Sequence, residues 1–192
     1  RMKDYQNILS PMLSLKFSPN DTKDLKNTDR RIDINNIFSI NRIGQSDVVE
    51  GGASLTYGAK FSKIDNFDKE IFTANIANIL RIDENEDLPR NSELGEKISA
   101  VVGEIAYTPS NNMKIKYNFS LDSNLNDKNY ELFTSEFKLN NFITSFDYLN
   151  ENNTTNKESY IANRTGYNFN NSQNLTFETR KNKKTKLTEF YN

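Results

Sequence analysis

The stretch "GGASLTYGAKFS", residues 51–62, decides the fold. Its side chains alternate strictly between two sets, apolar or small on one side and mostly polar on the other. The sets are Ala53, Leu55, Tyr57, Ala59 and Phe61 against Ser54, Thr56, Gly58, Lys60 and Ser62. Because successive side chains of a β-strand point to opposite faces, this period predicts a strand with one apolar and one polar face.

The same period of two recurs along the chain. Residues 11–17 and 113–121 alternate cleanly. Less regular alternation runs through residues 101–107, 133–139, 142–148 and 161–169. The segment 71–82 could be a helix by composition, but its apolar residues keep the two-residue spacing, so we interpret it as a strand. The chain is therefore predicted to be all-β, with about ten strands.

The predicted connections differ in length in a regular way. A long loop of about residues 20–51 is followed by links that alternate between short and longer. The short links are residues 65–68, 109–112, 140–141 and 170–174, and the longer ones are 83–97, 122–129 and 150–157. Outer-membrane barrels are built this way, with tight periplasmic turns and extended extracellular loops. We therefore expect residues 1–192 to be part of a single transmembrane, antiparallel up-and-down β-barrel domain, with 20–51 as an extracellular loop; a fragment of this size can also form an open curved sheet.

The composition agrees with this expectation. Only 35% of the residues are hydrophobic and the mean hydropathy is -0.79, which is poor for an ordinary packed core, yet the 11% aromatic content argues against disorder. In a barrel the lipid supplies the apolar environment, so one face of each strand can be polar. A soluble β-sandwich would show the same alternation, and the alternation alone does not separate the two. The loop asymmetry, the strand lengths and the high polarity favour the barrel.

Several function classes are disfavoured. The chain has 25 basic and 26 acidic residues, so no overall charge attracts it to nucleic acid. It contains no His, Cys or Trp, which removes imidazole and thiol catalysis and Cys-based metal sites from this segment. An approximate calcium-loop pattern at residues 83–87 fails, because Leu88 occupies the position that needs glycine. We expect no enzyme activity, no cofactor and no metal.

One basic run, "RKNKKTK" at residues 180–186, stands out. Its simplest interpretation is a solvated hairpin loop, and the alternative is a phosphate contact on the outer-leaflet side. The candidates for that contact are Arg180, Lys181, Lys183 and Lys184. Nucleic-acid binding is disfavoured because no aromatic platform is interleaved with the charges.

The residues that precede the decisive strand carry a family resemblance. The stretch "DINNIFSINRIGQSDVVEGGASLTYG", residues 33–58, resembles a loop and strand in the C-terminal barrel region of the LptD (OstA/Imp) lipopolysaccharide-assembly outer-membrane proteins. Residues 10–19, "SPMLSLKFSP", and residues 98–122 are similar to other segments of that family, in the same order.

The resemblance implies a function. It implies a lipopolysaccharide translocon in the outer membrane of a Gram-negative bacterium, which inserts lipopolysaccharide into the outer leaflet. The implied partners are lipopolysaccharide, outer-membrane lipid, an LptE-like lipoprotein plug and a periplasmic LptA-like bridge. The bridge would join through an N-terminal periplasmic domain that we expect, like the final strand or strands, to lie outside this segment. A general porin-like channel and a soluble β-sheet binding module remain alternatives.

Two sets of residues are candidates for function. We expect the loop to fold over or into the barrel mouth, held by a hydrogen-bond network rather than contacting substrate directly. The network candidates are Asp33, Asn36, Phe38, Asn41, Arg42, Asp47 and Glu50. The candidates for a polar luminal wall, which could pass a hydrated sugar-phosphate headgroup, are Ser54, Thr56, Lys60, Lys114, Lys116 and Asn118.

Overall fold

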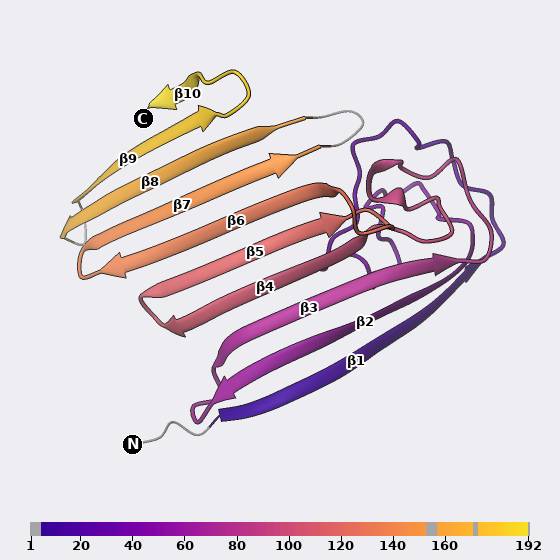
Figure 1. The fold of residues 1–192 in the computed structure, drawn as a ribbon, viewed down its shortest axis with the longest axis horizontal. Helices are drawn as coiled ribbons and strands as arrows, with labels where there is room; N and C mark the ends of the chain where they lie inside the picture. Colours follow the sequence, from indigo (N-terminus) through magenta and orange to yellow (C-terminus); the bar gives the residue numbers. More distant parts are fainter. Residues whose placement is uncertain (1–4, 153–156, 171–172, 192) are drawn as a thin grey trace.

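Ten antiparallel strands form one curved sheet in a computed structural model that describes residues 5–152, 157–170 and 173–191 (Figure 1). Each strand pairs with the next one along the chain. The strands are β1 (Tyr5–Ser18), β2 (Gly52–Asp65), β3 (Glu70–Arg81), β4 (Val101–Ser110), β5 (Met113–Leu121), β6 (Lys128–Leu139), β7 (Phe142–Glu151), β8 (Ser159–Asn170), β9 (Gln173–Asn182) and β10 (Thr188–Tyr191). The predicted all-β, up-and-down architecture is confirmed, including the strand interpretation of residues 71–82. The sheet is open, with β1 and β10 at opposite edges.

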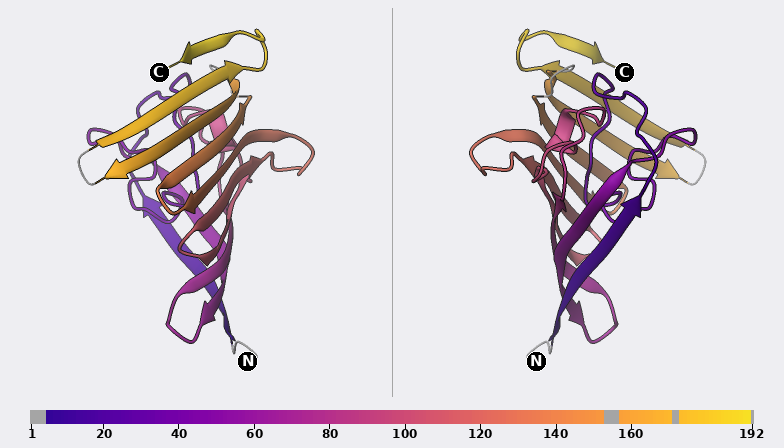
Figure 2. Two further views of the ribbon diagram at one scale, coloured as in Figure 1. Left: turned by 90° about the vertical axis from the view of Figure 1, so that its left-hand side faces the viewer. Right: turned by 90° about the vertical axis from the view of Figure 1, so that its right-hand side faces the viewer.

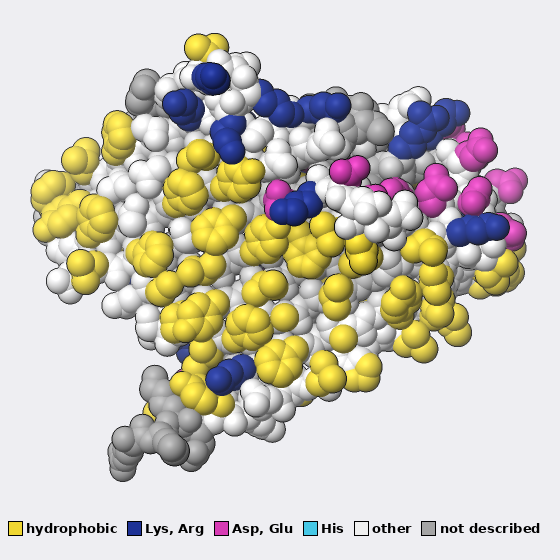
Figure 3. Space-filling view, in the orientation of Figure 1, with side chains coloured by type: hydrophobic (Ala, Val, Ile, Leu, Met, Phe, Trp, Pro, Cys, Tyr) yellow, Lys and Arg dark blue, Asp and Glu magenta, His cyan; other side chains and the backbone are white. Residues whose placement is uncertain are grey.

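The register gathers the apolar side chains on one face, which we call the outer face. In β1 and β2, Leu9 lies opposite Phe61 and Leu13 lies opposite Tyr57, so the apolar sets of both strands coincide. Leu15 is 81% exposed on this face. Figure 3 shows this side of the molecule, where hydrophobic side chains form a broad band over the strands. The polar sets of the same strands lie on the opposite, inner face.

The outer face is packed closely enough to require a glycine. Gly103 of β4 lies opposite Phe119 of β5, and a Cβ atom at position 103 would come within 2.3 Å of the Phe119 ring. The aromatic ring therefore covers backbone that only glycine leaves free.

The predicted alternation of turns and loops is also confirmed where the structure describes it. The links β2–β3, β4–β5 and β6–β7 are short and lie at one end of the strands, and the longer links lie at the other (Figure 1). In the turn between β6 and β7, Asn140 takes a left-handed conformation with φ 52°, which Asn tolerates better than most residues. Parts of two predicted links, residues 153–156 and 171–172, lie outside the described residues.

The two longest loops, residues 19–51 and 82–100, pack together and cover part of the inner face. The side views show the sheet curving around them (Figure 2). They enclose a small apolar core with residues of β3 and β4, which sequence periodicity did not reveal. Its buried members are Leu25, Ile32, Ile37, Ile43, Val48, Ala77, Ile79, Leu88, Leu94 and Val102. In the described part of the chain, no helix has the length and apolar character needed to cross a membrane.

Candidate functional site

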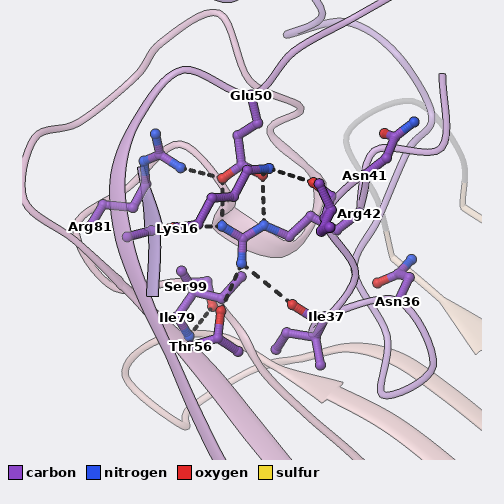
Figure 4. Close-up of polar contacts among 12 residues, drawn as sticks. Lys16, Asn36, Ile37, Asn41, Arg42, Glu50, Thr56, Ile79, Arg81 and Ser99 are labelled. Carbon is purple, nitrogen blue, oxygen red and sulfur yellow. Dashed lines mark hydrogen bonds and ion pairs between the residues drawn. The ribbon is translucent and has the colours of Figure 1, made fainter. Parts of the chain in front are cut away.

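The centre of the loop-covered region is the carboxylate of Glu50, the second residue before β2. Arg42, in the same loop, makes a bidentate contact with this carboxylate. Its Nε donates to Glu50 Oε2 at 2.6 Å and its Nη2 donates to Glu50 Oε1 at 2.7 Å (Figure 4). Arg81, the last residue of β3, donates from Nη1 to Oε1 at 2.6 Å. All three side chains are at most 2% exposed. This paired geometry is the strong form of an arginine–carboxylate contact.

A third cation completes the cluster. Lys16 of β1 donates from Nζ to Glu50 Oε2 at 3.0 Å and to the carbonyl oxygen of Ile40 at 2.8 Å. Burial alone would raise the pKa of the Glu50 carboxyl, but the hydrogen bond and charge of Arg42, with the charge of Lys16, outweigh it and lower that pKa to about 2. Glu50 is therefore ionised at neutral pH, with three cations around one anion.

Arg42 also fastens the loop to the sheet. Its guanidinium donates to Thr56 Oγ1 at 2.9 Å and to Ser54 Oγ at 2.6 Å, both on the inner face of β2. Ser54 and Thr56 therefore lie on the predicted luminal face, but they are only 5% and 2% exposed. The prediction that Ser54 and Thr56 line a solvent-exposed luminal wall is corrected, because the loop of residues 19–51 covers both side chains.

Lys16 and Arg81 were not among the predicted site residues. The pairing of β1 with β2 and of β2 with β3 places Lys16, Ser54 and Arg81 in one row across three strands. Lys16 is the one charged residue of β1, and the other charge of β3, Glu70, lies at the opposite end of that strand from Arg81. Only the inter-strand register therefore shows that Lys16 and Arg81 converge. At the entry to β2, Gly52 has φ +87°, and a Cβ atom there would lie 3.1 Å from Arg81 Nη2. The absence of a side chain at Gly52 therefore leaves room for the guanidinium group of Arg81.

The other predicted network residues make separate, local contacts. Asp33 accepts hydrogen bonds from the backbone N–H groups of Asn35 and Asn36, and Asn36 donates to the carbonyl of Arg31 at 3.1 Å. Asn41 accepts from the backbone N–H of Gly44 at 3.0 Å. These are turn-forming contacts of the kind that Asp and Asn favour.

The last two members of the predicted network, Phe38 and Asp47, differ in burial. Phe38 packs against the apolar core, and Asp47 makes an exposed ion pair with Lys23 at 3.2 Å. Within the predicted set, Arg42 and Glu50 are the pair joined by side-chain hydrogen bonds, and the functional roles of the set stay predictions.

The same loop also reaches the far side of the inner face. Arg31 donates to Glu151 Oε1 at 2.7 Å, at the end of β7, and its guanidinium lies 3.5 Å from the ring centroid of Tyr130 in β6. The loop therefore spans the concave side from the β1–β2 pair to the β6–β7 pair.

The three lysines among the remaining luminal candidates form ion pairs on the part of the sheet that the loops leave open. Lys60 pairs with Glu70 at 2.8 Å and Lys116 pairs with Glu104 at 2.6 Å. Lys114 lies 4.0 Å from Glu136 and is 59% exposed. All three cations, with Asn118, lie on the inner face, and their luminal role stays a prediction.

The basic run does not form one cluster. Arg180 lies on the inner face, where it pairs with Glu189 at 2.5 Å and stacks 3.9 Å from the Tyr160 ring centroid. Lys181 lies opposite Ile161 on the outer face. Lys183 is placed 4.8 Å from the ring centroid of Tyr148, and Lys184 lies in the turn that follows β9. The four candidates for a phosphate contact therefore do not share one face, because neighbouring residues of a strand point to opposite faces, and the contact itself stays a prediction.

The described residues contain no group of three or more His, Cys, Asp or Glu side chains that could hold a metal ion. The family model described as "LptD: LPS transport system D" matches residues 1–181. The chain belongs to the LptD family. The match includes the whole loop network and all strands through most of β9. A comparison with curated proteins found no match.

Membership of the LptD family confirms the resemblance seen in the loop before β2 and assigns the chain to LPS transport and assembly. LptD proteins are outer-membrane proteins, and the open, all-β sheet with one apolar face is compatible with that location.

Proposed function

We propose that this chain forms part of the wall of an outer-membrane translocon that inserts lipopolysaccharide into the outer leaflet. The observation that carries the proposal is the match to the LptD family over a sheet whose outer face is apolar and exposed. Leu9, Leu13, Leu15 and Phe17 of β1 are each between 69% and 81% exposed. Contiguous apolar surface of this extent marks a face that contacts lipid or another apolar surface.

The inner face suits the other part of the substrate. Lys, Glu, Asn, Ser and Thr side chains of β4 to β9 line it, and such a surface can pass a hydrated sugar-phosphate headgroup while the acyl chains leave toward lipid. An LptE-like plug and a periplasmic LptA-like bridge are the partners that this function requires.

The proposed role is transport without bond chemistry. Glu50 is the most deeply buried carboxylate of the loop network, and both its oxygens are occupied by cations. A carboxylate held ionised in this way, with its pKa lowered to about 2, is poorly suited to act as a general acid or base near neutral pH. We therefore assign the network to holding the loop in place.

Depletion of the full-length protein in its own cells tests the proposal. Lipopolysaccharide that reaches the cell surface would be quantified by labelling intact cells, beside the amount held in the inner membrane and periplasm. We expect surface lipopolysaccharide to fall as internal material accumulates. Unchanged surface lipopolysaccharide would overturn the proposal and leave a porin-like channel, whereas extraction of the protein without detergent would favour a soluble β-sheet module.

A further inference from the structure

A hollow of about 410 Å³ lies on the outer face, at the short-turn end of β1 to β4. The residues around it are Tyr5, Asn7, Phe61, Lys63, Ile71, Phe72 and Tyr107. Four of them lie opposite one another in a single row across the four strands, namely Asn7, Lys63, Phe72 and Tyr107. The register of the sheet therefore builds the hollow, and its volume is within the range of small-ligand sites.

Aromatic side chains wall the hollow. The ring centroids of Phe61 and Phe72 lie 6.1 Å apart, and Tyr107, opposite Phe72 on the next strand, is 41% exposed. The adjacent row, toward the middle of the strands, is apolar throughout and consists of Leu9, Phe61, Ala74 and Ile105. A hydrocarbon chain that extends from the hollow in this direction would therefore remain on apolar surface.

Lys63 places a positive charge at this aromatic hollow. Its Nζ lies 4.2 Å from the centroid of the Tyr5 ring, and within the described ranges it makes no ion pair. By contrast, Lys60 on the other face of β2 pairs with Glu70 at 2.8 Å. The carboxylate of Asp65 accepts hydrogen bonds from backbone N–H groups of its own turn. At this end of the first strands, Figure 3 shows basic atoms among hydrophobic side chains. The ammonium group of Lys63 is thus available to an anion.

A cation beside an aromatic and aliphatic surface matches a ligand that joins a phosphate to acyl chains. A lysine ammonium binds phosphate as a point charge. The amide of Asn7 and the hydroxyl groups of Tyr5 and Tyr107 add hydrogen-bond donors for phosphate and ester oxygens. Tyr and Lys side chains also gather where a membrane surface meets water. A free phosphate ion would use the cation and leave the aromatic walls uncovered, so the hollow favours a lipid.

The end of the sheet indicates which membrane leaflet supplies the lipid. Tight turns of outer-membrane sheets lie on the periplasmic side, and the periplasmic leaflet consists of glycerophospholipids. We infer that the hollow binds a glycerophospholipid of this leaflet, with its phosphate on Lys63 and its acyl chains along the apolar row. The inference takes the orientation of the sheet from the proposed function and goes beyond it, because this lipid is held on the outer face and is not transported.

Native mass spectrometry of the full-length protein, purified in detergent and stripped of its own lipid, tests the inference. Three probes would be added in turn: phosphatidylglycerol, diacylglycerol with the same acyl chains, and inorganic phosphate. We expect retention of phosphatidylglycerol and of neither other probe. Equal retention of diacylglycerol would indicate apolar contact alone, and binding of inorganic phosphate alone would indicate an anion site. Either result, or no retention of any probe, would overturn the inference.

Substitutions locate the bound lipid. Lys63→Gln removes the charge and should weaken the binding of phosphatidylglycerol about tenfold, which corresponds to about 1.4 kcal/mol. Lys63→Arg keeps the charge and should retain most of the binding. Lys181→Gln, on the outer face of β9 at the long-loop end, is the matched control and should bind like the parent sequence. Equal binding by all three variants, or an equal loss in Lys63→Gln and Lys181→Gln, would overturn the site.

Photo-crosslinking in living cells tests the same contact with Lys63 in place. A benzophenone side chain at position 107 replaces a ring that is already exposed, and mass spectrometry identifies the attached molecule. We expect a glycerophospholipid adduct; an adduct of lipopolysaccharide alone, or no lipid adduct, would overturn the inference.

Depletion of the protein distinguishes failure of this inference from failure of the proposed function. If depletion lowers surface lipopolysaccharide but position 107 captures no glycerophospholipid, only the lipid site is wrong. If surface lipopolysaccharide is unchanged on depletion, the proposed function is wrong, whichever lipid the hollow binds.

Discussion

The two halves of the inner face use the same kinds of residue under different conditions. Under the loops, Arg42 and Glu50 are both 2% exposed and their atoms lie 2.6 Å apart. On the open wall, Arg164 and Glu178 make a similar pair at 2.9 Å, with side chains 62% and 25% exposed. The covered half is a closed polar network over an apolar core, and the open half remains in contact with water.

The difference shows that a single sheet face can serve two purposes. A buried ion pair is costly to break because removing one partner leaves an uncompensated charge, whereas an exposed pair contributes little. The covered half therefore holds the loops in place, whereas the charged side chains of the open half stay exposed to solvent.

The largest expected effect comes from the centre of the covered half. Glu50→Gln leaves Arg42 and Arg81 buried without their counter-charge, which should lower the free energy of unfolding by about 3–5 kcal/mol. Urea unfolding of the full-length protein in detergent would measure it. Glu178→Gln, on the open wall, is the matched control and should cost less than about 1 kcal/mol. Equal losses from both would show that the covered and open halves hold their ion pairs with the same strength.

The apolar core under the loops offers the next comparison. Ile37 is fully buried, whereas Ile40, three residues along the same loop, is 90% exposed. Ile37→Ala should lower the free energy of unfolding by about 3 kcal/mol, and Ile40→Ala by less than about 0.5 kcal/mol. Limited proteolysis would follow the loop directly. Equal cleavage of the two variants would mean that the loop is not held by this core.

Acid should weaken the covered half. The folded-state pKa of Glu50 is about 2, below its ordinary value of 4.5, so the stability it contributes is complete above pH 4.5 and is lost as the pH falls toward 2. The difference corresponds to about 3 kcal/mol at most. Unfolding measured from pH 6 to pH 2 should show this loss in the parent sequence. A Glu50→Gln variant that kept the same pH dependence would rule out Glu50 as its source.

Loss of Arg42 should have a smaller effect than loss of Glu50. In Arg42→Ala, Glu50 keeps Arg81 and Lys16 as partners, so the expected loss is about 2 kcal/mol, with fewer assembled barrels. Assembly and lipopolysaccharide export would be measured together. If assembled Arg42→Ala protein accumulated normally but failed to export lipopolysaccharide, Arg42 would contact the substrate rather than hold the loop.

The smallest effect is expected where the loop meets the open half. Arg31→Ala removes the contact with Glu151 and the Tyr130 ring, and should cost about 1 kcal/mol. Protease sensitivity of residues 19–51 should rise while the strands stay intact. Arg31→Lys keeps the charge and should recover part of the protection; no change in either variant would show that this crossing contact is dispensable.

Much of the fold could be predicted from single stretches of sequence. The alternation in residues 113–121 and 53–61 gave both the strands and the face that each side chain occupies. The lengths of the links gave the end of the sheet at which the loops gather. The candidate site was harder to predict, because Asn36 and Asn41 lie in the same motif as Arg42 yet serve local turns.

The sequence by itself determined the strands, their two faces and the family, because side-chain period and motif order are local properties that survive without knowledge of neighbours. Only the tertiary structure decided which polar residues are buried. Lys16, Ser54 and Arg81 meet because the register of three strands aligns them, and Glu50 joins them because a long loop returns to that row. Those contacts join residues far apart in the chain, and no local pattern encodes them.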